Sequence, residues 1–377
     1  MSTFSTAGRI VVGAGVAAQL GDLVAGLGGR VLVVAGRSAD VDALTAGRDA
    51  SVWRWRGEPD VDAVRAAVAH AREVRPDVVV GWGGGSVLDL AKCVAVLAPG
   101  TTDVLDHLEV VGRGLPLPGG ALPVVAVPTT AGTGAEVTAN APVRVPDRGV
   151  KASLRGRAML PAVALVDPVL TLGCPPDVTA AAGADALTQC LEAFTTPQAT
   201  PLTDPLAHDG LVRAGRSLLR VHTHGDDLDA RTDLAVAALL SGMALANARL
   251  GVVHGLAAAL GGRLGAPHGQ VCAAVLAAAT AANVAALRRR DPDGPGLARY
   301  DAAAVALTGR PGARADDAVA WLAATVEALA VPGLDALGLD AADVPDVVAA
   351  TLAASSTRGN PVVLTPDELR DVLAASR

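Results

Sequence analysis

The sequence predicts two domains: an α/β domain over residues 1–173 with a mostly parallel, Rossmann-like sheet, and an all-helical domain over residues 174–377. Short β-branched runs alternate with helical stretches in the first half, which is typical of a parallel sheet with both faces covered by helices. Long Ala/Leu segments fill the second half, and no strand-like run separates them. A chain of 377 residues also exceeds the usual span of one hydrophobic core.

The strands expected in the first domain are short apolar runs that stop at glycine or a polar residue. The run RVLVVA at Arg30–Ala35 stops at Gly36, and DVVVGW at Asp77–Trp82 stops at further glycines. Between them, Asp60–Glu73 carries valines and alanines at helical spacing. The strands expected are Arg9–Val12, Arg30–Ala35, Asp77–Trp82, Leu122–Val127 and Ala162–Val166, with helices at Val16–Leu27, Asp60–Glu73 and Leu88–Leu97.

The second domain is expected to start near Gly173–Pro176, where glycine, cysteine and two prolines interrupt the pattern. Beyond this point the apolar segments are long enough for helices and rich in alanine and leucine, which favour helices. The helices expected are Thr179–Phe194, Pro205–Leu219, Asp229–Ala248, His254–Leu264, Val271–Leu287, Asp316–Leu329 and Pro366–Ala375.

Composition excludes several classes of protein. With 51% hydrophobic and only 18% charged residues, the chain is too apolar to be disordered. The formal net charge of −7 argues against nucleic acid as a partner, and the one basic run, Arg288–Arg290, is typical of the end of a helix. The four cysteines form no metal or disulfide pattern and are expected to be free thiols. Without a signal peptide or a convincing membrane span, the expected location is the cytoplasm.

Two glycine-rich turns are candidates for binding a phosphate. Gly13-Ala14-Gly15 follows the first strand and fits the Rossmann fingerprint, but similar glycines serve tight turns as well. The run Gly83-Gly84-Gly85-Ser86 follows the Asp77–Trp82 strand and opens a helix that carries Asp89. Successive glycines let a ligand approach the free amides of a helix N-terminus, which favours a pyrophosphate. The alternative is a purely structural turn in which Ser86 caps the helix.

A third loop supports a ligand site at the same edge of the sheet. Thr129, Thr130 and Thr133 stand among glycines directly after the Leu122–Val127 strand. Their hydroxyls and amides are hydrogen-bond donors, and ligands of open α/β sheets bind at the carboxyl ends of the strands.

Ala and Leu dominate the helices expected in the second half, so a polar residue on a buried helix face needs a reason. Asp185 and Gln189 are four residues apart and share one helix face, while His254 and His268 lie in glycine-containing segments. Buried without partners, such groups are costly. One carboxylate and two imidazoles form a suitable ligand set for a divalent metal, although a lone histidine is more often structural.

These motifs together resemble the iron-containing (group III) alcohol dehydrogenases over nearly the whole chain. Gly83–Lys92 (GGGSVLDLAK) is similar to the GGGSxxDxAK loop of that family, and Pro128–Glu136 (PTTAGTGAE) is similar to its PTTxGTGSE segment. Gly183-Ala184-Asp185-Ala186-Leu187, His254 and Pro267-His268-Gly269 match its metal-site segments in order. In the family Gly13-Ala14-Gly15 belongs to the first βα turn and does not bind the pyrophosphate.

The resemblance implies an NAD(P)-dependent enzyme that moves a hydride between the nicotinamide and an alcohol or aldehyde carbon. It implies a cofactor in a cleft between the domains, with Asp185, His254 and His268 as catalytic metal ligands and a metal, Fe or Zn, acting as a Lewis acid. A homodimer or larger homo-oligomer is also expected. From the resemblance and from the end of the second strand, the residues expected to bind the cofactor are Gly36, Arg37, Ser38, Gly84, Gly85, Ser86, Asp89, Thr129, Thr130, Thr133 and Lys151.

The chain departs from the family pattern at three places. Gln189 stands where the family has a histidine ligand, and Ala258 stands where many members carry another histidine near the substrate. Gln189 can still complete the metal site, but the metal can also be weakly held or lost. The second strand ends in Gly36-Arg37-Ser38 without the aspartate that repels a 2′-phosphate, so NADP is expected to be tolerated or preferred.

Several functions remain open at this point. The first is an alcohol dehydrogenase or aldehyde reductase, with a roomy apolar pocket for a bulky substrate if Ala257–Leu260 face it. The second is a metal-independent enzyme similar to maleylacetate reductases, which needs basic residues for a dicarboxylate; Arg249 and Arg263 are the few available. Sugar-phosphate cyclases share the fold but need more Lys and Arg. A degenerate cofactor-binding subunit is the non-enzymatic alternative.

Overall fold

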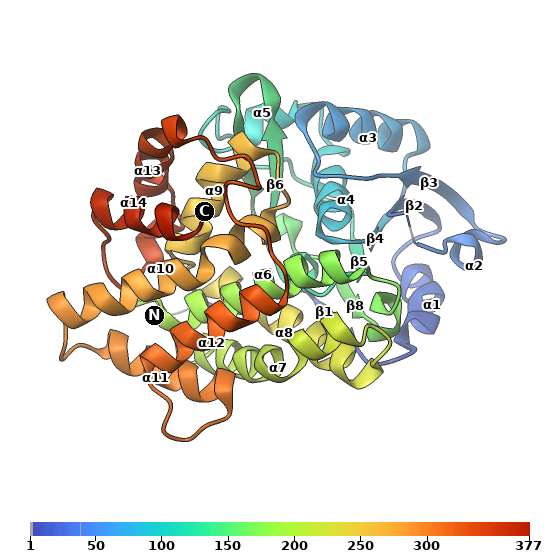
Figure 1. Cartoon of the computed structure of the whole chain (residues 1–377). Coiled ribbons are helices and arrows are strands. Elements are labelled where there is room, and N and C mark those ends of the chain that lie inside the picture. Colours follow the sequence, from blue (N-terminus) through green and yellow to red (C-terminus); the bar gives the residue numbers. More distant parts are fainter. Residues whose placement is uncertain (1–2, 38) are drawn as a thin grey trace. The chain divides into compact units, whose positions relative to one another are not determined.

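The computed structural model describes residues 3–37 and 39–377. These residues form two compact units. The first unit comprises residues 5–130 and 134–172, and the second comprises residues 3–4, 131–133 and 173–377. Figure 1 shows the sheet of the first unit and the helices of the second.

The first unit is built on a six-stranded sheet in the order β1-β8-β5-β4-β2-β3, with every neighbouring pair parallel. The parallel sheet predicted from the sequence is confirmed, although one edge strand, Asp49–Arg54, was not expected. This strand is only half-buried and therefore lacks a continuous apolar run. The strands are β1 (Arg9–Val12), β2 (Arg30–Ala35), β3 (Asp49–Arg54), β4 (Val78–Gly83), β5 (Val124–Pro128) and β8 (Val163–Val166).

Both faces of this sheet are covered, as the hydrophobic strands predict. Leu32 and Val34 of β2 join a core cluster with α3 (Val61–Val74) and α4 (Gly85–Leu97). The alternate residues Val31 and Val33 join a second cluster with α1 (Leu20–Ala25). A separate antiparallel pair, β6 (Asn140–Val145) and β7 (Val150–Arg155), was not expected from the sequence. The helices are η1 (Val16–Gln19), α1 (Leu20–Ala25), α2 (Asp42–Thr45), α3 (Val61–Val74), α4 (Gly85–Leu97), α5 (Val104–His107), η2 (Ala135–Val137), η3 (Pro146–Arg148), η4 (Arg157–Met159) and η5 (Pro168–Thr171).

The second unit is helical, and its described residues contain no strand. All seven helices expected there are present, and α11 and α13 are additional. The helices are α6 (Pro176–Thr195), α7 (Thr203–Thr223), α8 (Leu228–Asn247), α9 (Val252–Leu264), α10 (His268–Arg290), α11 (Pro295–Thr308), α12 (Ala315–Ala328), η6 (Ala341–Asp343), α13 (Val344–Ala353), η7 (Thr357–Gly359) and α14 (Pro366–Ala375).

Helix α6 lies at the centre of the second unit and packs against α7, α8 and α10. Small residues let these helices approach closely. A Cβ added at Gly183 of α6 would lie 2.4 Å from the Leu218 side chain of α7, and one added at Gly210 of α7 would lie 2.4 Å from Sγ of Cys190. Close packing of this kind fills the core although only 2% of the residues are aromatic.

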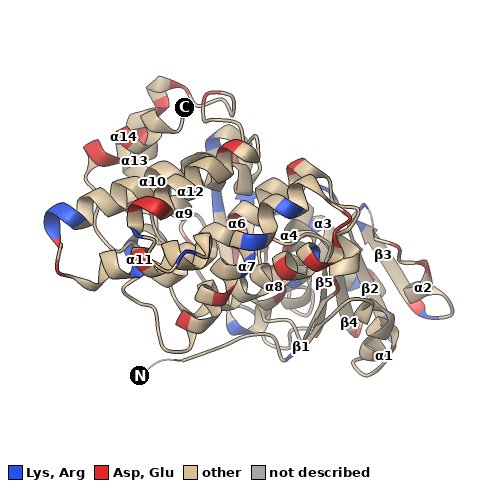
Figure 2. Cartoon of the chain, turned by 60° about the horizontal axis from the view of Figure 1, so that its bottom comes forward, with Lys and Arg blue, Asp and Glu red and all other residues tan. Residues whose placement is uncertain are grey.

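Helix α10 is long and apolar enough, by length and composition, to cross a membrane, and the bent pair α8 and α9 passes the same test together. In the structure α10 is mostly buried and packs against α6, α9, α12 and α14, as the core helix of a helical unit does. Its last turn carries Arg288, Arg289 and Arg290, which pair with Asp316 and Glu368. Elsewhere on the chain, positions with Lys or Arg are interspersed with positions that carry Asp or Glu (Figure 2).

Candidate metal centre and nucleotide site

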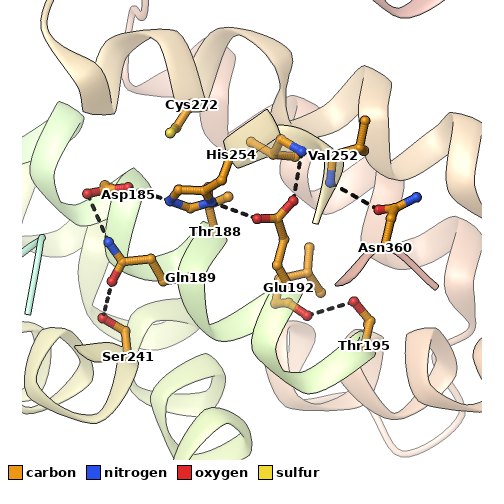
Figure 3. Close-up of polar contacts among 12 residues, drawn as sticks. Asp185, Thr188, Gln189, Glu192, Thr195, Ser241, Val252, His254, Cys272 and Asn360 are labelled. Atoms are coloured by element: carbon orange, nitrogen blue, oxygen red, sulfur yellow. Dashed lines mark hydrogen bonds and ion pairs between the residues drawn. The ribbon is translucent and has the colours of Figure 1, made fainter. Parts of the chain in front are cut away.

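One face of α6 carries three buried side chains that end in a carboxylate or an amide. Asp185, Gln189 and Glu192 are spaced four and three residues apart, so all three project from the same side of the helix. Each is less than 8% exposed. Figure 3 shows them in one row of contacts that continues to Ser241 of α8 and to His254 of α9.

His254 is fixed by Glu192 at the start of α9. The Glu192 carboxylate lies 2.6 Å from Nδ1 of His254, and its other oxygen accepts the backbone N–H of Val253 at 2.7 Å. Asn360 accepts the neighbouring N–H of Val252 at 3.1 Å. Because Nδ1 faces Glu192, Nε2 faces Asp185. Carboxylates hold metal-ligating histidines in this way in other proteins.

The charges of this row are strongly coupled. Burial by itself would lower the pKa of His254, but the carboxylates of Glu192 and Asp185 raise it to about 10. Burial would likewise raise the pKa of Asp185, but the contact with His254 and the charge of His268 lower it. Asp185 is therefore a carboxylate, as a metal ligand must be.

The structure brings Asp185, His254 and His268 together, and Cys272 joins them. One ligand atom from each of the four side chains lies within 4.8 Å of the other three. Oδ1 of Asp185 and Nε2 of His254 are buried without a hydrogen bond, although they face each other at 3.3 Å. Nε2 of His268 is 3.8 Å from the same carboxylate oxygen.

These distances fit a divalent metal. Two ligand atoms about 2.1 Å from a tetrahedral ion lie about 3.4 Å apart. This is close to the 3.3 Å between Oδ1 of Asp185 and Nε2 of His254. A buried acceptor and a buried ring nitrogen without hydrogen bonds are otherwise costly. The donor set of carboxylate, imidazole and thiol suits Zn²⁺ or Fe²⁺.

The side chain of Gln189, the other predicted ligand, has hydrogen bonds at both ends. Its Nε2 donates to Asp185 at 3.0 Å, and its Oε1 accepts from the hydroxyl of Ser241 at 2.7 Å. In this arrangement Gln189 orients Asp185. Ala258, one turn after His254, is exposed on α9, whereas Ala257 and Leu260 are buried.

Sequence reasoning missed Glu192, Ser241 and Cys272. The spacing contained a signal for two of them. Glu192 continues the helical face of Asp185 and Gln189, and Cys272 is one turn after His268 on α10. Ser241 gave no signal, because its contact with Gln189 depends on how α8 packs against α6.

The second candidate site lies at the N-terminus of α4, in the first unit. Gly84 is the N-cap residue and no side chain caps the helix, so Ser86 is not the cap that a purely structural turn would use. A Cβ at Gly83 would lie 2.8 Å from Val87, which gives that glycine a packing role. A Cβ at Gly84 would meet only Thr130, at 3.4 Å. Packing therefore does not require Gly84 to be a glycine.

Other predicted cofactor residues surround this helix start. The backbone N–H of Thr129 donates to the carbonyl of Gly83 at 2.9 Å, which places Thr129 and Thr130 beside the glycine run. Asp89 pairs with the buried Lys92 at 3.0 Å, and Lys151 pairs with Glu58 at 2.8 Å. Gly85 is buried in the first turn of α4. Thr133 is exposed and belongs to the second unit.

The loop after β2 carries the residues expected to decide between NAD and NADP. Arg37 is exposed, and Ser38 lies outside the described residues. Arg54 of β3, which the sequence did not single out, donates to the carbonyls of Gly36 and Ala39 at 2.8 and 2.9 Å. It therefore holds both ends of this loop.

The backbone amides at the Gly13-Ala14-Gly15 turn have hydrogen-bond acceptors within the protein. The backbone amides of Gly15 and Ala17 donate to the two carboxylate oxygens of Asp167 at 3.0 and 2.9 Å. A carboxylate of the protein thus occupies the place that a phosphate takes in a Rossmann fingerprint.

Known proteins match the whole length of this architecture. Residues 7–168 match the family model of iron-containing alcohol dehydrogenases, and residues 179–377 match the model of the C-terminal part of that family. The probable alcohol dehydrogenase EutG of Salmonella typhimurium is 37% identical over 324 residues, which cover 85% of this chain and 78% of the relative.

Two solved structures are similar across the fold. A 1,3-propanediol oxidoreductase has 28% identity and a TM-score of 0.89, with 100% of both chains covered. A sulfoacetaldehyde reductase from Bifidobacterium kashiwanohense, in complex with NAD⁺, has 25% identity and a TM-score of 0.86, with 99% of this chain and 98% of that chain covered. The class is therefore that of an oxidoreductase. The chain belongs to the iron-containing alcohol dehydrogenase family.

Proposed function

We propose that this chain is a metal-assisted, NAD(P)-dependent enzyme that interconverts an alcohol and its aldehyde or ketone. Residues 1–173 would bind the dinucleotide, and residues 174–377 would carry the metal and substrate site. The observation that carries the proposal is the cluster of Asp185, His254 and His268, with two buried ligand atoms that no hydrogen bond satisfies. Location in the cytoplasm and assembly into homo-oligomers remain expectations.

Each part of the site has a defined task in this proposal. Bound in the site, a divalent metal supplies Lewis-acid stabilisation of the substrate oxygen, and a nicotinamide supplies or accepts the hydride. Asp185, His254 and His268 hold the metal. Glu192 keeps Nε2 of His254 turned toward it, and Ser241 holds Gln189 against Asp185.

The proposed nucleotide site is built on the backbone amides at the N-terminus of α4. Gly84, Gly85 and Ser86 would bind the pyrophosphate, because the helix start has no side-chain cap and its dipole attracts an anion. Thr129, Thr130 and Thr133 would donate further hydrogen bonds, and Lys151 would lie beside the nicotinamide ribose. Asp89, through its ion pair with the fully buried Lys92, would stabilise the helix start.

The substrate class is a small or bulky alcohol without several negative charges. A dicarboxylate, as in the maleylacetate-reductase alternative, would need free basic groups near His254. Of the two basic residues available, Arg263 of α9 is paired with Asp343 and Asp346, and Arg249 is exposed. A panel of primary alcohols and aldehydes is therefore the appropriate assay.

The decisive test is turnover by metal-reconstituted protein with NAD(H) and NADP(H). Wild-type protein should reduce aldehydes. Asp185→Asn should lower kcat/KM by more than about a hundredfold, since replacing even a residue that only hydrogen-bonds a metal ligand lowers metal affinity or activity 10–100-fold. Undiminished turnover after complete metal removal would support the metal-independent alternative. Cofactor binding without turnover of any substrate would support the partner-subunit alternative.

NADP should be accepted as a cofactor. No acidic side chain follows β2 at Gly36 or Arg37, and a 2′-phosphate is excluded mainly by such a carboxylate. The Kd for NADPH should be at most about tenfold above that for NADH. Arg37→Glu should weaken the binding of NADPH more than the binding of NADH. A much larger preference for NADH in the wild-type protein would refute this assignment.

A further inference from the structure

Cys272 lies inside the ligand cluster of the helical unit. It is one turn after His268 on α10 and is fully buried, and its Sγ is 3.6 Å from Nε2 of His268. Its thiol end points toward the row of Asp185 and His254 (Figure 3). All of its distances to the ligand atoms of the other three side chains are within 4.8 Å.

Gln189 is poorly suited to complete the site from its present position. Both ends of its amide are engaged, with Asp185 and with Ser241. A neutral amide oxygen is also a weaker ligand than a thiolate for Zn²⁺ and similar ions, which bind cysteine sulfur readily. Turning the amide oxygen toward a metal would leave the hydroxyl of the buried Ser241 without this acceptor.

We propose that Cys272 supplies a thiolate as the fourth protein ligand of the metal held by Asp185, His254 and His268, in place of Gln189. This inference rests on the metal site of the proposed function. Ligation breaks the S–H bond, forms a metal–sulfur bond and releases the proton to solvent. One carboxylate and one thiolate then balance the charge of a divalent ion, and the set of one oxygen, two nitrogens and one sulfur suits Zn²⁺, which can expand to five ligands when a substrate oxygen binds.

Cobalt substitution tests this assignment without relying on activity. Metal-free protein is titrated with Co²⁺ while the near-ultraviolet absorption is recorded, because a cobalt–thiolate bond gives a charge-transfer band that nitrogen and oxygen ligands do not. The wild-type protein should bind one equivalent and show the band. Cys272→Ser should lose the band and bind Co²⁺ at least about tenfold more weakly.

Two control variants show whether the band depends on Cys272 itself. Gln189→Leu should keep the band, since Gln189 is not the ligand in this proposal. Cys190→Ala removes another buried thiol of the helical unit, one that lies near the Ala237 carbonyl and outside the cluster, and should also keep it. Cys272→Ala serves as a second variant if Cys272→Ser does not fold.

X-ray absorption of the zinc form provides a second readout. The wild-type spectrum should contain one sulfur at about 2.3 Å from the metal, and the Cys272→Ser spectrum should contain none. Stoichiometric metal with only nitrogen and oxygen ligands would overturn the role of Cys272 and leave the proposed function intact. Failure of the wild-type protein to bind metal would overturn both the thiolate ligand and the metal-assisted function.

Discussion

At the residue scale, Glu192 links the start of a helix to the orientation of a candidate ligand. It accepts the N–H of Val253 and contacts Nδ1 of His254, so one carboxylate both stabilises the N-terminus of α9 and orients the ring. The same side chain raises the pKa of His254. The orientation of His254 therefore depends on a residue outside the cluster of Asp185, His254, His268 and Cys272.

Replacing Glu192 should weaken metal binding. Glu192→Ala should raise the Kd for Zn²⁺ by about 10–100-fold, because the ring of His254 loses its positioning partner. Asn360→Ala is the matched control: it removes another acceptor at the start of α9 without touching His254. Competition with a chromophoric chelator measures both, and equal losses in the two variants would argue against a positioning role.

Glu136 is a second buried carboxyl, in η2 of the first unit, and it is only 3% exposed. Burial raises its pKa to about 7, and the nearby charge of Lys92 offsets this only in part. Between its usual pKa of 4.5 and about 7, the unfolded chain loses this proton while the folded chain keeps it. This carboxyl therefore makes the folded state less stable as the pH rises through that window.

Glu136→Gln should remove this pH dependence. From about pH 5 to about pH 8 the variant should gain about 2 to 3 kcal/mol of unfolding free energy relative to the wild-type protein. Urea denaturation at both pH values measures the difference. A pH-independent effect of Glu136→Gln would contradict the assignment.

At the scale of the element, the N-terminus of α4 separates two kinds of glycine. Gly81 and Gly83 are required by packing, because added Cβ atoms would lie 2.9 Å from Ala91 and 2.8 Å from Val87. Gly84, with a φ of −71°, has neither a conformational nor a packing need to be glycine. A ligand that approaches the backbone supplies the missing reason.

Alanine substitutions should separate these roles. Gly84→Ala should lower the stability by no more than about 1 kcal/mol, the usual effect of alanine at an N-cap. It should weaken NAD(P)H binding at least about tenfold, because its Cβ enters the space of the phosphates. Gly83→Ala should cost about 1–3 kcal/mol from overpacking. Fluorescence titration measures the cofactor affinity of both variants, and thermal unfolding measures their stability. Unchanged cofactor affinity in Gly84→Ala would contradict a phosphate site here.

At the scale of the whole molecule, the two units are expected to respond to different ligands. A metal should protect residues of the helical half, and a dinucleotide should protect the start of α4 and the Thr129–Thr130 loop. At a hundredfold excess over Kd, either ligand stabilises the state it binds by about 2.7 kcal/mol. Hydrogen exchange should therefore show metal protection confined to residues 174–377. Metal protection centred on α4 would contradict this division of roles.

Much of this protein could be predicted from the sequence because the signals are local. β-Branched runs ending at glycines predicted the central strands, and long Ala/Leu segments predicted helices of the second unit. Strand β3 and the β6–β7 pair escaped prediction because β3 is half-buried and β6 contains Pro142. Residue types and order alone indicated Asp185, His254, His268 and the Gly83–Ser86 run.

The sequence by itself determined the parallel sheet, the helical half and the family, since each depends on patterns within a few turns or strands. Only the tertiary structure decided that Asp167 occupies the anion position at Gly15, that Ser241 engages Gln189, and that Cys272 reaches the ligand cluster. These contacts join residues far apart along the chain. The contact of Asp167 depends on the pairing of β1 with β8. Those of Ser241 and Cys272 depend on the packing distances of whole helices, which tight Ala and Gly contacts set in this protein and which no local pattern encodes.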